Sequence, residues 1–365
     1  LMRDNLPSFQ FLNLDNMPDS LLAGNLVQRS LNIFRKYGDV YQTAGSYRTL
    51  ASCYWQIKDY RSERGELHPV LRLSYELAGP ALGTAPIVLV NHALTGNSSV
   101  AGEQGWWNRL VSPEGAISPE VYTILAFNIP GNGYDGELCE DPERFTLLDV
   151  ARLILQGLEA LGIAELYAIV GGSMGGALTW QLAYLRPHLA RHIVPIASDW
   201  RASDWLLTQT LIQRQILANS SDPLRDARIH AMACYRTPQS LNARFASQLD
   251  EEGSCYRVES WLRYHGDRLK ERFLLSAYGV MTYLTYSIGV CQEAAELARI
   301  ASDIHIVSID SDLLFTHDRA EATYRTLAAL RPGVTLDVIH SIHGHDAFLM
   351  EYEQLNALLR PYFAR

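Results

Sequence analysis

Short apolar runs alternate with segments of helical periodicity along most of this 365-residue chain, and this alternation limits the possible folds more than any other feature. The runs at 86–91, 121–127, 166–170, 192–197 and 303–309 are continuous, as in strands that are buried on both faces. Strands that alternate with helices predict an α/β fold with a mostly parallel sheet and right-handed crossovers.

Further segments fit the same plan. Residues 70–77 approach the period-two alternation of a half-exposed strand, and 334–339 form another short apolar run. Gly162 is suited to the left-handed position that ends a helix. The segments with helical spacing are 147–161, 175–185, 319–330 and 346–359.

The alternation stops between residues 200 and 297, where the patterns are helical, aromatic residues are frequent and no strand is evident. An all-helical block inside an α/β sheet predicts an inserted lid. We therefore expect a first part of the core at 61–199, a helical lid at 200–297 and a second part of the core at 298–365. Residues 1–60 show no clean period and are expected to form an N-terminal extension.

Composition excludes several classes of protein. Hydrophobic residues make up 48% of the chain, too many for a disordered protein. With 31 basic and 40 acidic residues the formal charge is −9, which argues against nucleic-acid or anionic-membrane binding. No apolar run approaches the ~20 residues of a membrane span, and the first 30 residues contain no signal-peptide core.

The five cysteines are scattered without C-x-x-C spacing, so we expect reduced thiols, a cytoplasmic location and no metal site.

Residues 171–176 read Gly-Gly-Ser-Met-Gly-Gly and contain the G-x-S-x-G pattern, directly after a predicted buried strand and directly before a helix. This is the context of a nucleophile elbow, in which a tight turn projects the serine hydroxyl above the sheet. The first amides of the following helix point at the same place and favour developing negative charge. The pattern predicts that Ser173 is a nucleophile.

A serine nucleophile needs a base and an acid that orients the base, and in this arrangement both follow the serine along the chain. The acid is expected after a late strand, where Asp312 and Asp310 are both candidates. The base is expected in the loop after the last strand. Three histidines lie there: His340, His343 and His345.

An oxyanion hole needs two backbone N–H donors. Met174, the residue after the nucleophile, is expected to supply one, and the loop after the strand at 86–91 the other. We assign the second donor to Leu94 and interpret His92, in the same loop, as a residue that stabilises it.

Five motifs together resemble the homoserine O-acetyltransferase family of α/β-hydrolase-fold enzymes, over about residues 65–360. They are Asn-His-Ala-Leu-Thr-Gly at 91–96, Gly-Trp-Trp at 105–107, the motif at 171–176, Ser-Asp-Leu-Leu-Phe at 311–315 and Gly-His-Asp-Ala-Phe-Leu at 344–349. The resemblance implies an α/β-hydrolase fold. It also implies that Asp312 is the acid and His345 the base.

The resemblance further implies a ping-pong reaction in which Ser173 takes an acetyl group from acetyl-CoA and passes it to L-homoserine in methionine biosynthesis. Acetyl-CoA is then a co-substrate, and no cofactor is bound permanently. Arg228 matches the family's carboxylate-binding arginine, Tyr235 its partner tyrosine and Asp346 its ammonium-binding aspartate. Pairing of two copies through the lid, as is common in the family, predicts a homodimer.

This sequence departs from the family pattern at three places. They are the loop at 128–136, the start of the helix after the nucleophile (Gly175-Gly176-Ala177-Leu178) and the shortened stretch at 219–224 before Arg228. These positions lie near the expected mouth of the site, so the alternatives are serine as acceptor, succinyl-CoA as donor, or hydrolysis of esters and thioesters.

Overall fold

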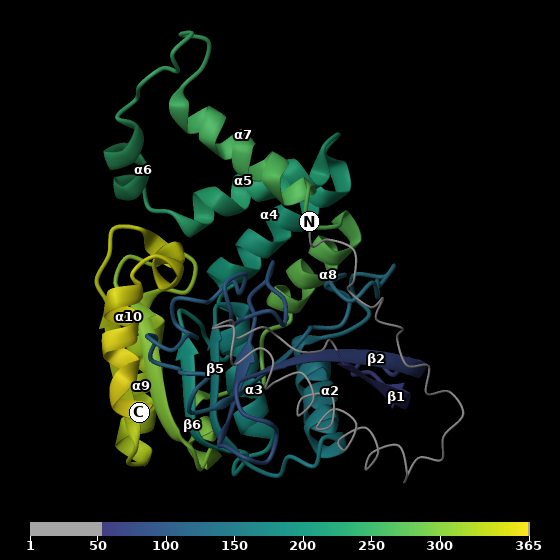
Figure 1. Cartoon of the computed structure of the whole chain (residues 1–365). Helices are drawn as coiled ribbons and strands as arrows, with labels where there is room; N and C mark the ends of the chain where they lie inside the picture. Colours follow the sequence, from purple (N-terminus) through teal and green to yellow (C-terminus); the bar gives the residue numbers. More distant parts are fainter. Residues whose placement is uncertain (1–52, 364–365) are drawn as a thin grey trace, which may run out of the picture.

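The computed structural model describes residues 53–363, which form one eight-stranded sheet with helices on both faces (Figure 1). The strand order is β1-β2-β4-β3-β5-β6-β7-β8, and every pairing from β4 to β8 is parallel. This architecture confirms the predicted α/β-hydrolase fold. The strands are β1 (Cys53–Arg61), β2 (Leu67–Ala78), β3 (Ile87–Asn91), β4 (Thr123–Phe127), β5 (Leu166–Gly172), β6 (Ala190–Ile196), β7 (Asp303–Ile309) and β8 (Val334–Ile339).

Alternate residues of the central strands enter two separate hydrophobic cores. Leu89 and Ile169 face one core, which α2, α3 and α9 complete, whereas Val90 and Val170 face the other, completed by α10. Both faces of these strands are therefore apolar, which is why the sequence shows continuous runs and no alternation. The flanking helices are α2 (Leu147–Ala160), α3 (Met174–Leu185), α9 (His317–Leu330) and α10 (Tyr352–Leu359).

Helix α2 shows how local sequence sets the ends of an element. Thr146 and Asp149 form a reciprocal capping box at its start. Gly162 has φ +69° just beyond its end, as the sequence predicts. The buried Asp149 carboxylate also accepts hydrogen bonds from the Tyr60 hydroxyl (2.7 Å) and the Glu63 amide (2.8 Å), and so attaches the β1–β2 hairpin to the helix.

The end of the predicted N-terminal extension at 1–60 overlaps a strand of the sheet. Residues 53–61 form β1, an edge strand antiparallel to β2. Asp59 adopts φ +51°, and the two buried side chains Ile57 and Tyr60 are three positions apart, so the alternation that identifies a strand is broken. The rest of the predicted extension, residues 1–52, lies outside the described residues.

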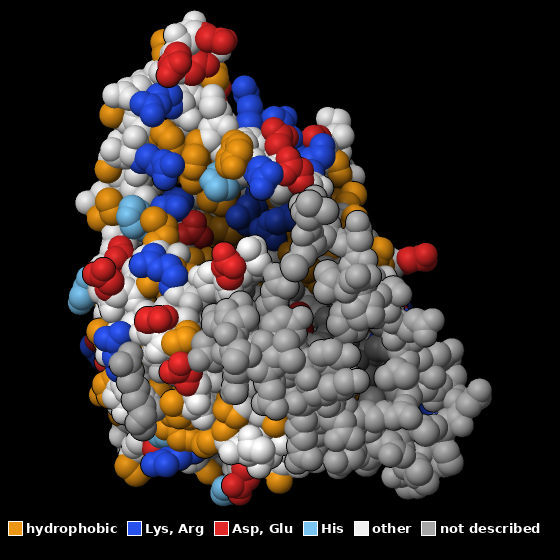
Figure 2. Space-filling model, in the orientation of Figure 1, with side chains coloured by type: hydrophobic (Ala, Val, Ile, Leu, Met, Phe, Trp, Pro, Cys, Tyr) orange, Lys and Arg blue, Asp and Glu red, His pale blue; other side chains and the backbone are white. Residues whose placement is uncertain are grey.

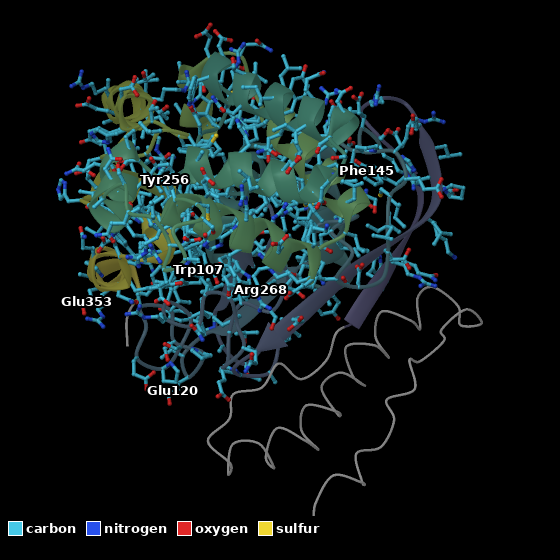
Figure 3. All side chains as sticks on the ribbon, turned by 90° about the horizontal axis from the view of Figure 1, so that it is seen from above. Trp107, Glu120, Phe145, Tyr256, Arg268 and Glu353 are labelled. Atoms are coloured by element: carbon cyan, nitrogen blue, oxygen red, sulfur yellow. The ribbon has the colours of Figure 1, made fainter. Side chains whose placement is uncertain are left out.

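Five α-helices lie between β6 and β7 and sit above the carboxyl ends of the strands, as Figures 1 and 3 show from the side and from above. We refer to them as the helical insert: α4 (Asp204–Asn219), α5 (Pro223–Tyr235), α6 (Pro238–Phe245), α7 (Arg257–Lys270) and α8 (Leu275–Tyr286). Three short 3₁₀ helices, η1 (Ala294–Arg299), η2 (Gly344–Leu349) and η3 (Arg360–Tyr362), complete the second half of the fold. None of the helices within 53–363 combines the length and apolar character needed to cross a bilayer.

Candidate active site

Ser173 lies at the turn between β5 and α3 with φ +57° and ψ −128°, a conformation that L-residues rarely adopt. The turn is tight because two glycines allow close backbone approach. A Cβ atom on Gly171 would lie 2.2 Å from the Gly175 carbonyl oxygen, and one on Gly175 would lie 2.3 Å from the Asn91 carbonyl oxygen. Strain of this kind costs about 1–3 kcal/mol and is typical of functional sites. The elbow predicted from residues 171–176 is therefore present.

The structure brings Ser173, His345 and Asp312 into one hydrogen-bonded line. His345 Nε2 lies 2.8 Å from Ser173 Oγ, and His345 Nδ1 lies 2.7 Å from Asp312 Oδ2. The other carboxylate oxygen of Asp312 accepts hydrogen bonds from the amides of Leu314 (2.7 Å) and Phe315 (3.0 Å). Oδ2 of the Asp312 carboxylate accepts a hydrogen bond from Nδ1–H of His345. In that tautomer Nε2 carries no proton and can take the proton of Ser173.

The surroundings of His345 set its proton affinity. The imidazole is buried, which lowers its pKa, but the charge and hydrogen bond of Asp312, with a smaller contribution from Asp346, outweigh burial and raise the pKa overall. The rings of Tyr235, Phe315 and Phe348 surround the imidazole at centroid distances of 5.4–5.6 Å. A base of raised pKa in an aromatic enclosure is suited to hold a proton during acyl transfer.

The competing candidates have other partners. Asp310 pairs with His340 at 2.9 Å, and both side chains are exposed. His343 contacts the Ser240 hydroxyl at 2.9 Å. The geometry therefore selects Asp312 and His345 from the sets that the residues alone left open. Within 53–363, no group of three or more His, Cys, Asp or Glu side chains is placed to hold a metal ion.

The loop after β3 approaches the nucleophile, and hydrogen bonds of the buried His92 ring stabilise it. The ring is fully buried and its pKa falls to about 4 because of that burial, so it is neutral. His92 Nε2 accepts a hydrogen bond from the Ile129 amide at 3.0 Å, and Nδ1 lies 2.8 Å from the Ala93 carbonyl oxygen. Among residues 53–363, the amides of Leu94 and Met174 have no hydrogen-bond acceptor, as donors reserved for an oxyanion require.

Two of the predicted substrate-binding residues come from α5 of the helical insert. The Arg228 guanidinium lies 5.6 Å from the Tyr235 ring centroid, and the Tyr235 ring lies 5.6 Å from His345. Burial raises the pKa of the Tyr235 hydroxyl to about 12, so it remains protonated. Arg228 makes no ion pair within the described part of the chain, so its charge is available to a ligand.

Asp346, the third predicted substrate-binding residue, already has a partner that the sequence analysis missed. Arg236 Nε donates to Asp346 Oδ2 at 2.9 Å, and both side chains are largely buried. The sequence signal that could have drawn attention to Arg236 is its position directly after Tyr235, a predicted substrate-binding residue. Because the two charges lie 110 residues apart in sequence, no local pattern could pair them.

A second missed residue connects the helical insert to the oxyanion loop. Arg272, between α7 and α8, donates from Nη1 to the Thr95 carbonyl oxygen (3.1 Å) and to the Tyr134 hydroxyl (3.2 Å). Phe273 packs edge-on against Tyr134. Thr95 follows the proposed donor Leu94, so the insert is in position to fix the geometry of this loop.

A cavity of about 40 Å³ lies between the helical insert and the core. Leu94, Tyr235 and Leu314 connect it to the site, and the Thr285 hydroxyl in its wall lies 3.4 Å from Met174 Sδ. The remaining lining residues come from the insert: Leu206, Gln209, Thr210, Gln213, His230, Ala231, Cys234, Tyr278 and Thr282. The chamber next to the triad is thus small, and the surface that lines it is almost entirely apolar.

Comparison with known proteins identifies relatives of this chain in both sequence and fold. The family model described as "alpha/beta hydrolase fold" matches residues 86–343. A homoserine O-acetyltransferase of Salinibacter ruber is 33% identical over 313 residues, which are 76% of this chain and 87% of that protein. Two solved structures share the fold: a homoserine O-acetyltransferase from Bacillus anthracis (TM-score 0.78, 17% identity, 86% and 98% of the chains) and esterase E22 (TM-score 0.77, 15% identity, 86% and 100%).

Proposed function

The chain belongs to the α/β-hydrolase fold family and, within it, to the homoserine O-acetyltransferases, and from this membership we infer that it transfers an acetyl group to the hydroxyl of L-homoserine in methionine biosynthesis. The observation that carries this function is the sequence identity to homoserine O-acetyltransferases over most of both chains. We propose acetyl-CoA as the donor and Ser173, His345 and Asp312 as the catalytic residues.

In the proposed first half-reaction, His345 Nε2 takes the proton of Ser173 as Oγ attacks the thioester carbonyl carbon. The negative charge that develops on the carbonyl oxygen is stabilised by the amides of Leu94 and Met174. The C–S bond then breaks, the proton on His345 passes to the departing sulfur, and CoA leaves an acetyl-serine. The hydrogen-bonded line from Ser173 to Asp312 supports this sequence of proton transfers.

In the second half-reaction, His345 takes the hydroxyl proton of homoserine, and the resulting oxygen nucleophile attacks the acetyl-serine. The tetrahedral intermediate collapses, the proton returns to Ser173 Oγ, and O-acetylhomoserine leaves. Homoserine is zwitterionic, so its carboxylate is assigned to Arg228 and its ammonium group to Asp346, with Tyr235 beside them. Asp346 already accepts from Arg236, so the ammonium group would use its remaining oxygen.

The helical insert is proposed to act as the lid of this site. A transferase must keep water away from the acyl-serine, and His345 and Asp312 are each only 3% exposed beneath the insert. The reaction as proposed uses no resident cofactor or metal. Cys139, Cys234, Cys255 and Cys291 are all free thiols, which supports a cytoplasmic location.

We also propose a homodimer that forms through the helical insert. Large hydrophobic side chains are exposed there, including Trp205 (50%), Leu211 (54%) and Tyr264 (58%). Exposed apolar side chains of this size are common at protein interfaces. Light scattering tests the proposal directly, because a mass that stays at 41.0 kDa at all protein concentrations would contradict it.

The decisive experiment on function measures CoA release from acetyl-CoA, with a thiol reagent, in the presence of L-homoserine, L-serine or no acceptor. Strong stimulation by homoserine alone is expected. Release that is independent of acceptor, together with turnover of simple esters, would instead identify a hydrolase. Stimulation by serine, or a preference for succinyl-CoA, would change the acceptor or the donor while retaining the mechanism.

A further inference from the structure

A cluster of cations and aromatic rings lies on the helical insert beside the active site. The Arg236 guanidinium carbon lies 5.7 Å from the Trp261 ring centroid, and that of Arg244 lies 5.5 Å from the same centroid. The His265 ring packs edge-on against Trp261 at 4.5 Å. Together with Arg228, these residues form what we call the lid cation cluster. Figure 2 shows Lys and Arg side chains on the insert around the hollow that separates it from the core.

The charges of this cluster do not balance. Arg228, Arg236 and Arg244 carry three positive charges, and among the described residues the one carboxylate that forms an ion pair with any of them is that of Asp346, paired with Arg236. Burial, and then the three guanidinium groups, lower the pKa of His265 against the opposing effect of Asp346. A surplus of two positive charges therefore lies at the site of a chain whose net charge is −9.

Homoserine cannot account for this surplus. A zwitterion contributes one carboxylate and one ammonium group, so its binding leaves the sum of charges unchanged. Arg228 and Asp346 already suffice for its two ends. Arg244 is exposed, lies over Phe245 and Trp261, and makes no ion pair with the described residues. The remaining positive charge therefore fits a second ligand that is strongly anionic.

We propose that Arg244, together with Arg236 and beside Trp261, binds the phosphate groups of the acyl-CoA donor. This inference rests on the proposed function, in which CoA carries the acetyl group. Guanidinium groups bind phosphate oxygens through paired, charge-assisted hydrogen bonds, and arginine suits this role better than lysine. The contacts run inward from Arg244 to Trp261, to Arg236 and to Asp346, which is adjacent to His345. Phosphates bound at the outer end would leave the thioester arm directed toward Ser173.

The test compares two donors that differ only in the phosphate-bearing part. Acetyl-CoA and S-acetylpantetheine carry the same thioester, but the second lacks the nucleotide and its phosphates. With saturating homoserine, kcat/KM for each donor reports the acetylation half-reaction. For Arg244→Gln we expect a fall of about 10-fold with acetyl-CoA and no change with S-acetylpantetheine, because one charge-assisted contact is lost.

Arg268→Gln is the matched control. Arg268, labelled in Figure 3, is exposed on α7, the helix that carries Trp261, and pairs with Glu271 outside the cluster. We expect it to match the wild type with both donors. In addition, the dependence of kcat/KM on salt with acetyl-CoA should be weaker in Arg244→Gln than in the wild type or the control.

The outcomes separate this inference from the proposed function. If Arg244→Gln leaves kcat/KM for acetyl-CoA unchanged, or lowers kcat/KM for both donors by the same factor, the proposed phosphate site is contradicted. The proposed acetylation chemistry would be unaffected by that result. If wild-type Ser173 is not acetylated by acetyl-CoA in intact-mass spectra, the proposed donor fails and the phosphate site fails with it.

Discussion

The core and the helical insert build their parts of the site by different means. The core supplies the strained serine turn, the glycine contacts and the backbone amides, and the side chains of His345 and Asp312 in it are almost completely buried. The insert supplies long arginine and aromatic side chains, and two of its guanidinium groups, those of Arg228 and Arg244, make no ion pair with described residues. In the proposed reaction, backbone geometry in the core stabilises the acyl intermediates, whereas charged side chains on the insert are assigned to binding the substrates.

The largest effect is expected from a change in the core. Ser173→Ala removes the oxygen that carries the acetyl group, and we expect CoA release to fall by a factor of about 10⁴ or more. Intact-mass spectrometry after mixing with acetyl-CoA should show no acetylated protein. Ser254→Ala, in an exposed loop of the insert, should be acetylated like the wild type. Persistent acetylation of Ser173→Ala would contradict the assignment of the nucleophile.

Asp312→Asn tests how the core tunes its base, and we expect a loss of about 10³–10⁴ in kcat. Acetylation requires neutral His345, so activity is lost as the pH falls through the pKa of this histidine. Burial lowers that pKa and the Asp312 carboxylate raises it, with a net rise in the wild type. Without the carboxylate the acid limb of kcat/KM for acetyl-CoA should move to lower pH. A limb that stays in place or moves upward would show that Asp312 does not control the base.

Arg228→Gln examines the contribution of the insert to acceptor binding. Loss of a charge-assisted contact to the homoserine carboxylate should raise the KM for homoserine by about 10- to 100-fold. The first release of CoA should proceed at the wild-type rate, because the donor is acetylating Ser173 before homoserine acts. Arg263→Gln, on α7 and paired with Glu259, serves as the control. An equal effect on both half-reactions would argue against a carboxylate site at Arg228.

The smallest effect is expected where the two regions meet. Arg272→Gln removes the hydrogen bond from the insert to the Thr95 carbonyl oxygen, so the neighbouring Leu94 amide is held less firmly. We expect the acetylation rate constant in stopped-flow measurements to fall by about 3- to 10-fold, with the KM for homoserine unchanged. Tyr134→Phe removes only the second acceptor of Arg272 and should cost less. A larger loss in Tyr134→Phe than in Arg272→Gln would place the control of this loop elsewhere.

The sequence by itself determined those parts of the protein that depend on local order. Continuous apolar runs identify strands buried on both faces, and Thr146, Asp149 and Gly162 mark the ends of a helix. The serine turn is equally local, because the glycines that permit it lie within two residues of Ser173. Burial and backbone conformation repeat with the period of the element, so they leave a pattern that can be recognised.

Only the tertiary structure decided which groups meet. From the residues alone, Asp310 was as plausible an acid as Asp312, and the resemblance to a known family was needed to choose between them before the fold showed the partners. His345 lies 172 residues from the serine it contacts, and Arg236 lies 110 residues from Asp346. Contacts of this kind depend on where loops from distant strands and insert helices meet in space. Sequence periodicity reports only local structure, so it cannot predict these contacts. Strand β1 was not predicted for a related reason. Its own apolar pattern is interrupted, and its identity as a strand depends on its pairing with β2.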